Sequence, residues 1–498
     1  MAHHMQVSRE FLPLPSPDEI KKLYPPNLEL LQVQILFRHG ERTPVRARFQ
    51  TWGLKPFWPF CKIAERFTQT IVTYPNDAAS PFEYVRRLES VAKELPNNVP
   101  IPASGFAPGE HDGLCMLGEL TDLGRFTGFK LGEKLRSLYV DQLNFLPPMF
   151  TDHSDFYLRS SHVARSNETL LSLFQALYPP NFRAAGLKPV IYTRLFPQEN
   201  AYPNDENCKR LSELGFMFSE IVAQKWNPVL SGYPSQMLND VLPNGVAIDG
   251  SPRASGIFDT VSACVAHDIA LPEGFNDQKV MDTLKESVID EWYLGVKSSK
   301  EYRKLAVGAL AGDFLHRLRL AVTKDEQRHG SPTTIKGLLK GKSTPKEEAV
   351  KFALYGSHDT TIASLLCALD AYDDSWPPFT SDLTFELFAD AQKGPSNIAT
   401  SASSSSATSK RDYYVRLTYN DKIVHLPACS TPGTNLSGDK SFCTLAAFEA
   451  ALSQFIPQNW ELACRSNLGK SILDAPKMAE AFKKTPKAEG VVMQKQQA

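Results

Sequence analysis

The sequence lacks three features that would assign it to a common class of protein. It has almost no net charge, with 54 Lys and Arg against 55 Asp and Glu, so no basic excess favours binding to nucleic acid or to an anionic membrane. No apolar run approaches the roughly 20 residues of a membrane span, which predicts no transmembrane segment. No Cys-x-x-Cys pair occurs among the 8 cysteines, which disfavours a zinc ribbon or a thioredoxin-type site. Any anion recognition must therefore come from a local cluster.

What is present is a globular composition in a chain long enough for two or three domains. The chain has 498 residues, of which 42% are hydrophobic and 22% charged. Residues 1–5 resemble a remnant of an expression tag, and no secretory signal follows them, which leaves open whether a native leader was removed at this point.

Three segments predict buried strands that end in polar motifs. Residues 28–37, 156–158 and 352–355 are apolar and stop at Arg38-His39-Gly40, Arg159-Ser160-Ser161 and Gly356-Ser357-His358-Asp359. Helical patterns follow the second and third, and residues 121–139 form an amphipathic helix. The alternation predicts an α/β fold, a large domain with a central, mostly parallel sheet flanked by helices. Ligands in such sheets bind at the carboxyl ends of the strands.

The same patterns predict the domain organisation. We expect a discontinuous α/β catalytic domain over residues 27–180 and 331–470, interrupted by a smaller, mainly helical cap over residues 181–330. Residues 392–411 are rich in serine and predict a flexible loop, and the charged, polar tail 483–498 predicts disorder.

The motif Arg38-His39-Gly40-Glu41-Arg42-Thr43-Pro44 carries the strongest chemical signal. Two arginines bracket a histidine directly after a buried strand, and arginine binds phosphate through two hydrogen bonds at once. A histidine held between them is placed to attack phosphorus. The alternative is a helix cap with solvated arginines. A second motif, His358-Asp359, follows an apolar strand and precedes a helix.

These motifs resemble those of the histidine acid phosphatases, branch 2 of the histidine phosphatase superfamily. Similar segments follow in the same order: 118–121 with Gly124, 159–161 with Arg165, 357–360, and 376–378 with 386–387. Within the family, residues 165–167, 202–204 and 382–384 are most similar to the lysophosphatidic acid phosphatases.

The resemblance implies a phosphoglycerate mutase-like fold and a role for each matching residue. His39 would be the nucleophile that forms a phosphohistidine intermediate, and Asp359 would protonate the leaving oxygen. The phosphate would be held by Arg38, Arg42, Arg159 and His358. No metal or cofactor is implied, because three arginines can neutralise the phosphate.

Other residues are candidates for the substrate pocket. Phe57 and Trp58 follow the signature closely and form either core packing or an apolar wall beside the phosphate site. His267 lies in the expected cap, where it either lines the pocket or has a structural role. A polyanionic substrate such as phytate is an alternative, because three basic residues lie in the same stretch: Arg46, Arg48 and Lys55.

The resemblance also implies two disulfides, Cys208 with Cys464 and Cys429 with Cys443. Paired cysteines favour a secretory or extracellular location, whereas the lysophosphatidic branch favours mitochondria.

The prediction is therefore a metal-independent acid phosphatase that hydrolyses phosphate monoesters, with lysophosphatidic acid as the favoured substrate. A phytase or a broad-specificity acid phosphatase is the alternative within this class. The alternative from another class is a non-catalytic protein that binds phosphate ligands. The sequence leaves open the physiological substrate, the compartment, the oligomeric state and glycosylation at Asn435.

Overall fold

The computed structural model describes residues 6–73, 78–91, 100–102, 113–329, 347–391 and 411–469. Apart from Arg411, the expected Ser-rich loop lies outside the described residues, as does the expected disordered tail 483–498.

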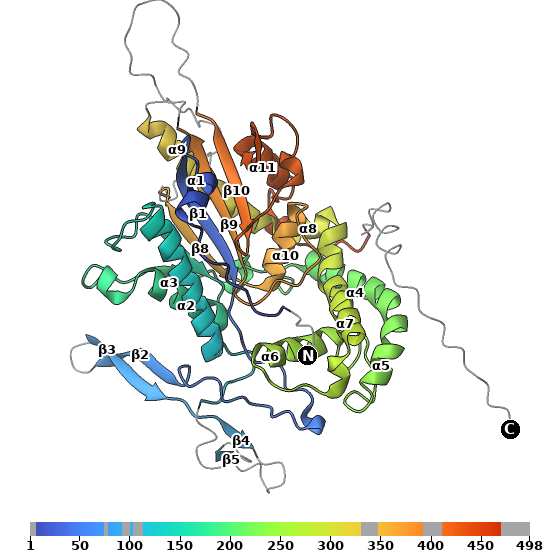
Figure 1. Cartoon of the computed structure of the whole chain (residues 1–498). Helices are drawn as coiled ribbons and strands as arrows, with labels where there is room; N and C mark the ends of the chain where they lie inside the picture. Colours follow the sequence, from blue (N-terminus) through green and yellow to red (C-terminus); the bar gives the residue numbers. More distant parts are fainter. Residues whose placement is uncertain are drawn as a thin grey trace, which may run out of the picture.

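The centre of the fold is one mixed sheet (Figure 1). Its strands, in spatial order, are β12 (Asn435–Leu436), β13 (Asp439–Thr444), β10 (Tyr413–Tyr419), β9 (Asp382–Asp390), β1 (Leu28–Arg38), β8 (Phe352–Ser357), β6 (Phe156–Ser160) and β7 (Ile191–Tyr192), and β11 (Lys422–Ile423) pairs with β10. The half from β1 to β7 is parallel, and β9 runs antiparallel to β1. Arg38 pairs in register with Ser357, so both polar motifs emerge at the same edge of the sheet.

Helices cover both faces of the sheet because the buried residues of β1 alternate in direction. Val33, Ile35 and Phe37 pack with α2 (Asp122–Arg136) and α3 (Ala164–Leu177). Leu36 faces the opposite side, where α9 (Gly308–Arg328), α10 (Asp359–Ala368) and α11 (Leu445–Ser453) lie. The expected α/β fold with helices around a central sheet is confirmed.

A group of helices lies beside the carboxyl edge of the parallel strands (Figure 1). These are α4 (Lys209–Leu230), α5 (Tyr233–Met237), α6 (Ala254–Ala266), α7 (Gln278–Ser298) and α8 (Lys300–Ala306), and we call α4 to α8 the cap. Much of the cap packs around its own apolar cluster, which includes Trp226, Phe258 and Leu284. Helix α9 falls within the range expected for the cap but packs on the sheet, because its Phe314 contacts Tyr355 and Phe385 of the central strands.

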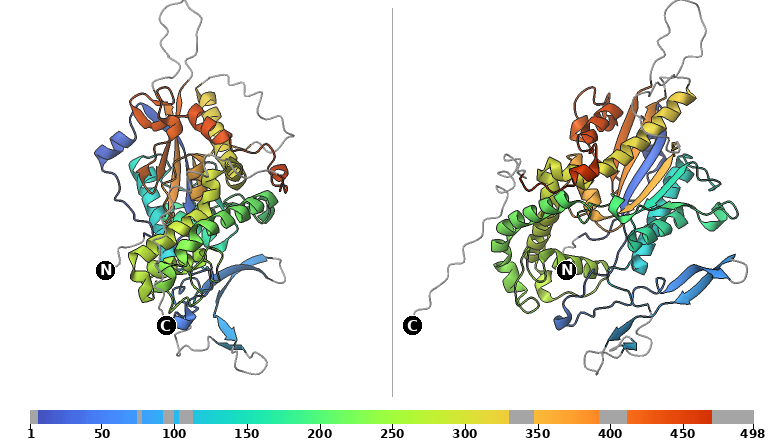
Figure 2. Two further views of the ribbon diagram at one scale, coloured as in Figure 1. Left: turned by 90° about the vertical axis from the view of Figure 1, so that its right-hand side faces the viewer. Right: turned by 180° about the vertical axis from the view of Figure 1, so that it is seen from behind.

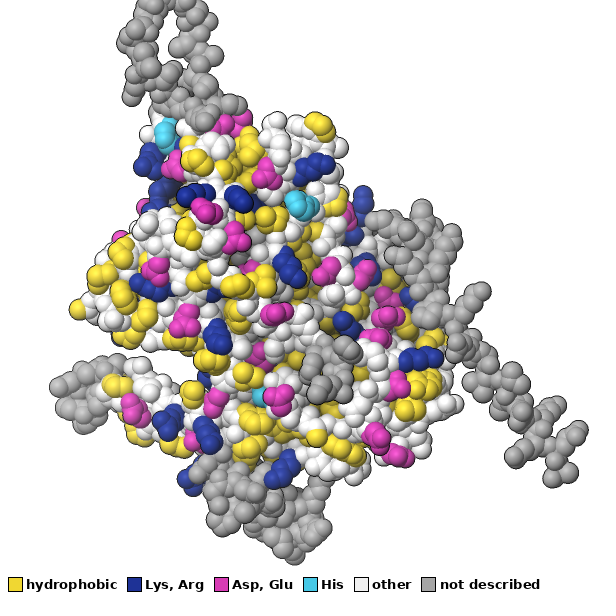
Figure 3. Space-filling model, viewed as in Figure 1, with side chains coloured by type: hydrophobic (Ala, Val, Ile, Leu, Met, Phe, Trp, Pro, Cys, Tyr) yellow, Lys and Arg dark blue, Asp and Glu magenta, His cyan; other side chains and the backbone are white. Residues whose placement is uncertain are grey.

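Shorter elements complete the described chain. The helices are α1 (Pro17–Leu23), α12 (Trp460–Ala463), a π-helical turn (Ser137–Gln142), and the 3₁₀ turns Gln50–Trp52, Pro180–Phe182, Phe196–Gln198, Glu273–Asn276 and Pro427–Cys429. No helix among the described residues is long and apolar enough to cross a membrane. On the face drawn in Figure 3, side chains of both charge signs are interspersed, which agrees with the near-zero net charge.

An insertion between β1 and α2 was not predicted from the sequence. It contains two small hairpins, β2 (Arg66–Thr73) with β3 (Ala78–Val85) and β4 (Glu89–Val91) with β5 (Pro100–Pro102). Figure 2 shows that the first hairpin extends away from the central sheet. Sequence patterns did not predict this insertion, because its strands are polar in part, β4 and β5 have only 3 residues each, and the residues between the strands lack a clear periodicity.

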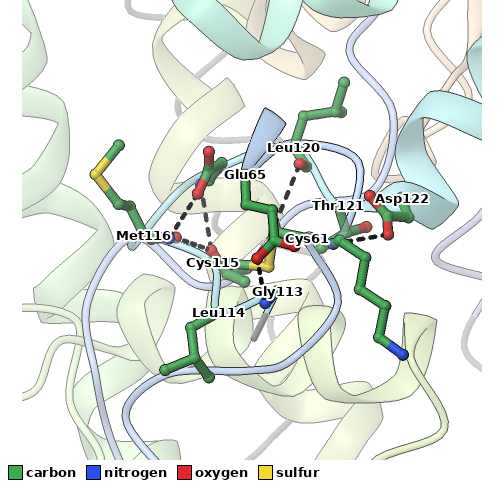
Figure 4. The surroundings of a disulfide bond; sticks show 12 residues. Cys61, Glu65, Gly113, Leu114, Cys115, Met116, Leu120, Thr121 and Asp122 are labelled. Atoms are coloured by element: carbon green, nitrogen blue, oxygen red, sulfur yellow. Dashed lines mark hydrogen bonds between the residues drawn. A yellow bond between two sulfur atoms is a disulfide. The ribbon is translucent and has the colours of Figure 1, made fainter. Parts of the chain in front are cut away.

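Three disulfides tie distant segments together. The pairs implied by the resemblance, Cys208–Cys464 and Cys429–Cys443, are both present. A third bond, Cys61–Cys115, was not expected and closes the insertion against the start of α2 (Figure 4). Around it, Asp122 accepts hydrogen bonds from the backbone of Lys62 and Ile63. Cys264 and Cys367 are free and buried.

Candidate active site

The loop after β1 is fixed by close backbone contact with the first turn of α2. A Cβ atom at Gly40 would lie 2.2 Å from the carbonyl oxygen of Gly124, and one at Gly124 would lie 2.2 Å from that of Glu41. Only glycine permits this approach, which explains why both motifs carry it. The contact anchors the loop that presents His39.

His39 is buried, with 2% of its surface exposed, and its ring is oriented by the backbone. Nδ1 lies 2.8 Å from the carbonyl oxygen of Gly40. A carbonyl only accepts hydrogen bonds, so Nδ1 carries the proton and Nε2 keeps its lone pair. Burial, together with Arg165, Arg38 and Arg42, holds the pKa of His39 well below its ordinary value. The lowered pKa favours the neutral imidazole, whose Nε2 lone pair is free.

His358 and Asp359 stand at the start of α10, beside His39. The two histidine rings are 5.5 Å apart between centroids, and Nε2 of His358 lies 3.1 Å from the hydroxyl of Ser161. Burial and the charge of Arg165 lower the pKa of His358 to about 3. A neutral His358 can form a hydrogen bond with a ligand in the site but adds no positive charge to it.

The Asp359 carboxylate is held by two donors. Oδ2 lies 2.7 Å from a guanidinium nitrogen of Arg38 and accepts a hydrogen bond of 3.2 Å from Nε1 of Trp376. Burial acts to raise the pKa of Asp359, but Arg38 and Arg42 outweigh it and the net effect is a lowered pKa. An anion that engages the arginines would weaken this effect and favour the protonated acid.

The third arginine at the site is Arg165 rather than Arg159. Arg165 lies in the first turn of α3 and lines the same cavity as Arg38, Arg42 and His39. Burial and the nearby charge of Arg42 lower its pKa to about 10. Arg159, the residue expected to hold phosphate, does not line this cavity. Its guanidinium is 1% exposed and forms an ion pair of 2.5 Å with buried Glu199, and it also contacts Asp313.

Both arginines belong to the segment that the sequence analysis selected. They lie six positions apart, and Arg159 is in strand β6 whereas Arg165 is in the first turn of helix α3, so their side chains have different surroundings. The Arg159 side chain, near the end of β6, pairs with buried Glu199, whereas Arg165, in the first turn of α3, lines the cavity together with His358. The signal that could have selected Arg165 is this position in the first turn of the helix.

The cap supplies a carboxylate to the site. Asp259 of α6 forms an ion pair of 2.8 Å with Arg42, and its second oxygen accepts a hydrogen bond of 3.0 Å from the backbone nitrogen of Val45. The cap thereby fixes the orientation of Arg42. Sequence reasoning missed Asp259, because a single aspartate in a helix carries no motif.

The cavity in front of His39 has a volume of about 1100 Å³, far more than a phosphate group fills. One part of its lining is apolar and includes Phe49, Phe258, Trp292 and Trp376. Another part is basic and includes Arg46, Arg48 and Lys285.

The structure does not bring the pocket candidates Phe57, Trp58 and His267 to the cavity lining. Trp58 is 3% exposed and packs in the apolar cluster of the cap. Both ring nitrogens of His267 are satisfied, Nδ1 by the carbonyl of Ala263 and Nε2 by the hydroxyl of Thr121. These partners give His267 a structural role at the contact between α6 and α2.

The three arginines at the site each keep an unused donor. Among the described residues, the Nε atoms of Arg38, Arg42 and Arg165 have no hydrogen-bond partner, as is also the case for Arg9, Arg86 and Arg159 elsewhere in the fold. Unused guanidinium donors around a neutral histidine match the needs of a phosphate group. The carboxyl of Glu41 belongs to the wall behind the site, where its pKa is raised by burial and it accepts a hydrogen bond of 2.5 Å from Thr127.

Among the described residues, one group has the spacing of metal ligands, Glu29, Asp325 and His329. It lies near the start of β1, at the opposite end of the strand from His39. Arg411 already forms ion pairs with Glu29 and Asp325. This group therefore does not supply a metal to the cavity.

The comparisons with known proteins agree with this geometry. The model of the histidine phosphatase superfamily (branch 2) matches residues 29–420. A protein of Schizosaccharomyces pombe named "Probable acid phosphatase" is 35% identical over 477 residues, covering 90% of this chain and 97% of that protein. The human lysophosphatidic acid phosphatase type 6 is more distant, at 28% identity over 72% of this chain and 74% of that protein. Among solved structures, the phytase of Hafnia alvei in complex with tartrate matches with a TM-score of 0.52 and 16% identity, covering 89% of this chain and 100% of that chain.

These matches correct one expectation. The short motifs indicated that the lysophosphatidic acid phosphatases would be nearest, yet the probable acid phosphatase of S. pombe is more similar over a longer alignment. Short motifs sample few positions, so they identify the family better than the branch. The chain belongs to branch 2 of the histidine phosphatase superfamily and is a histidine acid phosphatase, an enzyme that hydrolyses phosphate monoesters.

Proposed function

We propose that hydrolysis proceeds through a phosphohistidine at His39, with Arg38, Arg42, Arg165 and His358 holding the phosphate. The observation that carries this assignment is the neutral His39 with its free Nε2, surrounded by guanidinium groups at the carboxyl edge of the sheet. Nε2 attacks phosphorus, the P–O bond to the leaving group breaks, and water then cleaves the P–N bond. The arginines neutralise the charge that the phosphoryl group carries throughout.

Asp359 is the proposed acid for the leaving oxygen. When a phosphate dianion engages Arg38, the arginine no longer lowers the pKa of Asp359 as strongly, and burial then favours the protonated carboxyl. The proton passes to the leaving oxygen as the P–O bond breaks. The rate should therefore fall as the pH rises through the pKa of Asp359 in the complex.

The test compares Asp359→Asn with His39→Ala on two substrates. His39→Ala should lose several orders of magnitude on both, because no phosphoenzyme forms. Asp359→Asn should lose about 10²–10⁴-fold on an alkyl phosphate and much less on p-nitrophenyl phosphate, whose leaving group needs little protonation. Equal losses of Asp359→Asn on both substrates would remove Asp359 from this role. Wild-type protein that binds phosphate without turning over either substrate would support the non-catalytic alternative.

The reaction is proposed to need no metal, because the arginines supply the positive charge. Turnover should be unchanged after EDTA treatment. Loss of most activity on chelation, restored by a divalent ion, would refute this part of the mechanism.

For the substrate, we propose a phosphate monoester with a large apolar leaving group, of which lysophosphatidic acid is the first candidate. The aromatic lining from Phe258, Trp292 and Trp376 supports an acyl chain, as does the relation to the human lysophosphatidic acid phosphatase. A fully buried CH₂ is worth about 0.8 kcal/mol, or roughly fourfold in kcat/KM. The value of kcat/KM should therefore rise with acyl length, and Trp292→Ala should flatten that rise.

A polyanionic substrate such as phytate is the second candidate, favoured by Arg46, Arg48 and Lys285 in the lining. In that case, Arg46→Ala should slow the hydrolysis of phytate more than that of lysophosphatidate, and the acyl length of lysophosphatidates should have no effect on kcat/KM. A panel of lysophosphatidates, phytate and p-nitrophenyl phosphate between pH 4 and 7 separates the two candidates.

A further inference from the structure

The segment before α1 reaches the active site from outside the sheet. The carbonyl of Val7 accepts a hydrogen bond of 2.7 Å from the backbone nitrogen of Phe379, and the backbone nitrogen of Arg9 donates one of 3.1 Å to the carbonyl of Phe379. Gln6 and Val7 also line the cavity. We call residues 6–9 the N-terminal strap. The strap thereby satisfies both the backbone N–H and the backbone carbonyl of Phe379.

Phe379 in turn contacts the groups that the proposed mechanism uses. Its ring is 2% exposed, and its centroid lies 4.0 Å from the guanidinium carbon of Arg38 and 5.8 Å from that of Arg42. The ring of His39 is 5.9 Å away. A guanidinium over a buried ring face is held by a cation–π interaction that also fixes its plane.

The side chain of Arg9 anchors the N-terminal strap through ion pairs. It is 1% exposed and forms ion pairs with Asp382, at the start of β9, and with Asp421, the latter at 2.7 Å. Asp382 is itself buried, and burial raises its pKa while Arg9 lowers it. The buried Arg9 side chain thereby ties the strap to the start of β9 and to Asp421, which also pairs with Lys134 of α2.

We propose that Arg9 is a positioning residue for phosphate binding: it locks the N-terminal strap onto Phe379, and Phe379 orients the guanidinium of Arg38. This inference rests on the proposed role of Arg38 in holding the phosphate. Arg9 itself does not touch the substrate. Its effect therefore falls on the affinity for anions and on the orientation of Arg38.

The experiment measures the inhibition constants of inorganic phosphate and vanadate, kcat and KM on p-nitrophenyl phosphate, and the melting temperature. Arg9→Gln should raise both inhibition constants and KM by about 3- to 30-fold, the range of a buried cation–π contact. Arg9→Lys should restore part of the affinity, because it keeps the charge between the two carboxylates. Phe379→Leu should raise the constants by a similar factor, and adding Arg9→Gln to it should change them little further.

The matched control is Arg411→Gln. Arg411 is also a buried arginine with two carboxylate partners, Glu29 and Asp325, but it lies at the far end of β1. The Arg411→Gln variant should have a lower melting temperature than the wild type and unchanged inhibition constants for phosphate and vanadate. If Arg9→Gln fails to fold, the double variant Arg9→Gln/Asp382→Asn removes both charges of the pair and makes the same prediction.

Two results would overturn the inference. One is a lower melting temperature in Arg9→Gln with unchanged inhibition constants, as in the control. The other is a loss of affinity that adds fully to that of Phe379→Leu, because Arg9 would then act by another route. Failure of the wild-type protein to bind phosphate or vanadate would instead refute the proposed function.

Discussion

Replacing Arg165 and Arg159 by methionine should change stability in opposite directions. Arg165 is largely buried beside other arginines, and burial together with the charge of Arg42 lowers its pKa from the ordinary value of arginine to about 10. At about 1.4 kcal/mol per unit, its charged form costs the free protein on the order of 3 kcal/mol. Arg165→Met removes this buried charge and its repulsion by Arg42, so the free energy of unfolding should rise by about 1–3 kcal/mol.

Arg159 is in the reverse situation. Its partner Glu199 is 1% exposed and also accepts hydrogen bonds from the backbone nitrogens of Asn200 and Ala201. Arg159→Met leaves this carboxylate buried without its counter-charge, a change that typically costs about 3–5 kcal/mol. The variant should therefore have a lower melting temperature than the wild type.

Activity should separate the two variants in the opposite sense. Arg165→Met should lose about 10²–10³-fold in kcat/KM on p-nitrophenyl phosphate, because one charged donor to the phosphoryl group is gone. Arg159→Met, assayed per folded molecule at a temperature well below its melting point, should stay within about threefold of the wild type. Thermal melts and the inhibition constant of inorganic phosphate complete the comparison.

A folded Arg159→Met that no longer binds phosphate would refute this assignment. So would an Arg165→Met variant that is destabilised and fully active, because Arg165 would then be the structural arginine.

Two further predictions concern stability. The Cys61–Cys115 bond closes a loop with a sequence separation of 54, so the Cys61→Ala/Cys115→Ala variant should lose about 4 kcal/mol in a urea unfolding experiment. An unchanged unfolding midpoint would show that this bond does not stabilise the insertion. Burial and Arg165 lower the pKa of His358 to about 3, so the unfolded chain takes up a proton below pH 6.5 while the folded protein does not. The free energy of unfolding should therefore fall as the pH drops from 6.5 toward 3, and His358→Asn should reduce this dependence by up to about 1.4 kcal/mol per pH unit. A pH dependence equal to that of the wild type would contradict the lowered pKa.

The fold class and the centre of the site could be predicted from local sequence motifs. Arg38, His39 and Arg42 belong to one contiguous motif after an apolar strand, and His358-Asp359 to another. Such motifs predict well because a strand end, a turn and a helix start are local, and parallel strands bring their carboxyl ends to one edge.

The residues that surround this centre could not be predicted, because contacts between distant parts of the chain select them. Whether Arg159 or Arg165 faces the cavity depends on which of them meets Glu199, a contact between residues 40 positions apart. The apolar wall comes from Phe258, Trp292 and Trp376, which are scattered along the chain, whereas the nearby Trp58 is buried in the cap. The N-terminal strap meets Phe379 across more than 360 residues of sequence. Contacts of this kind leave no periodicity or spacing in the sequence, because packing, and not local propensity, selects the partner.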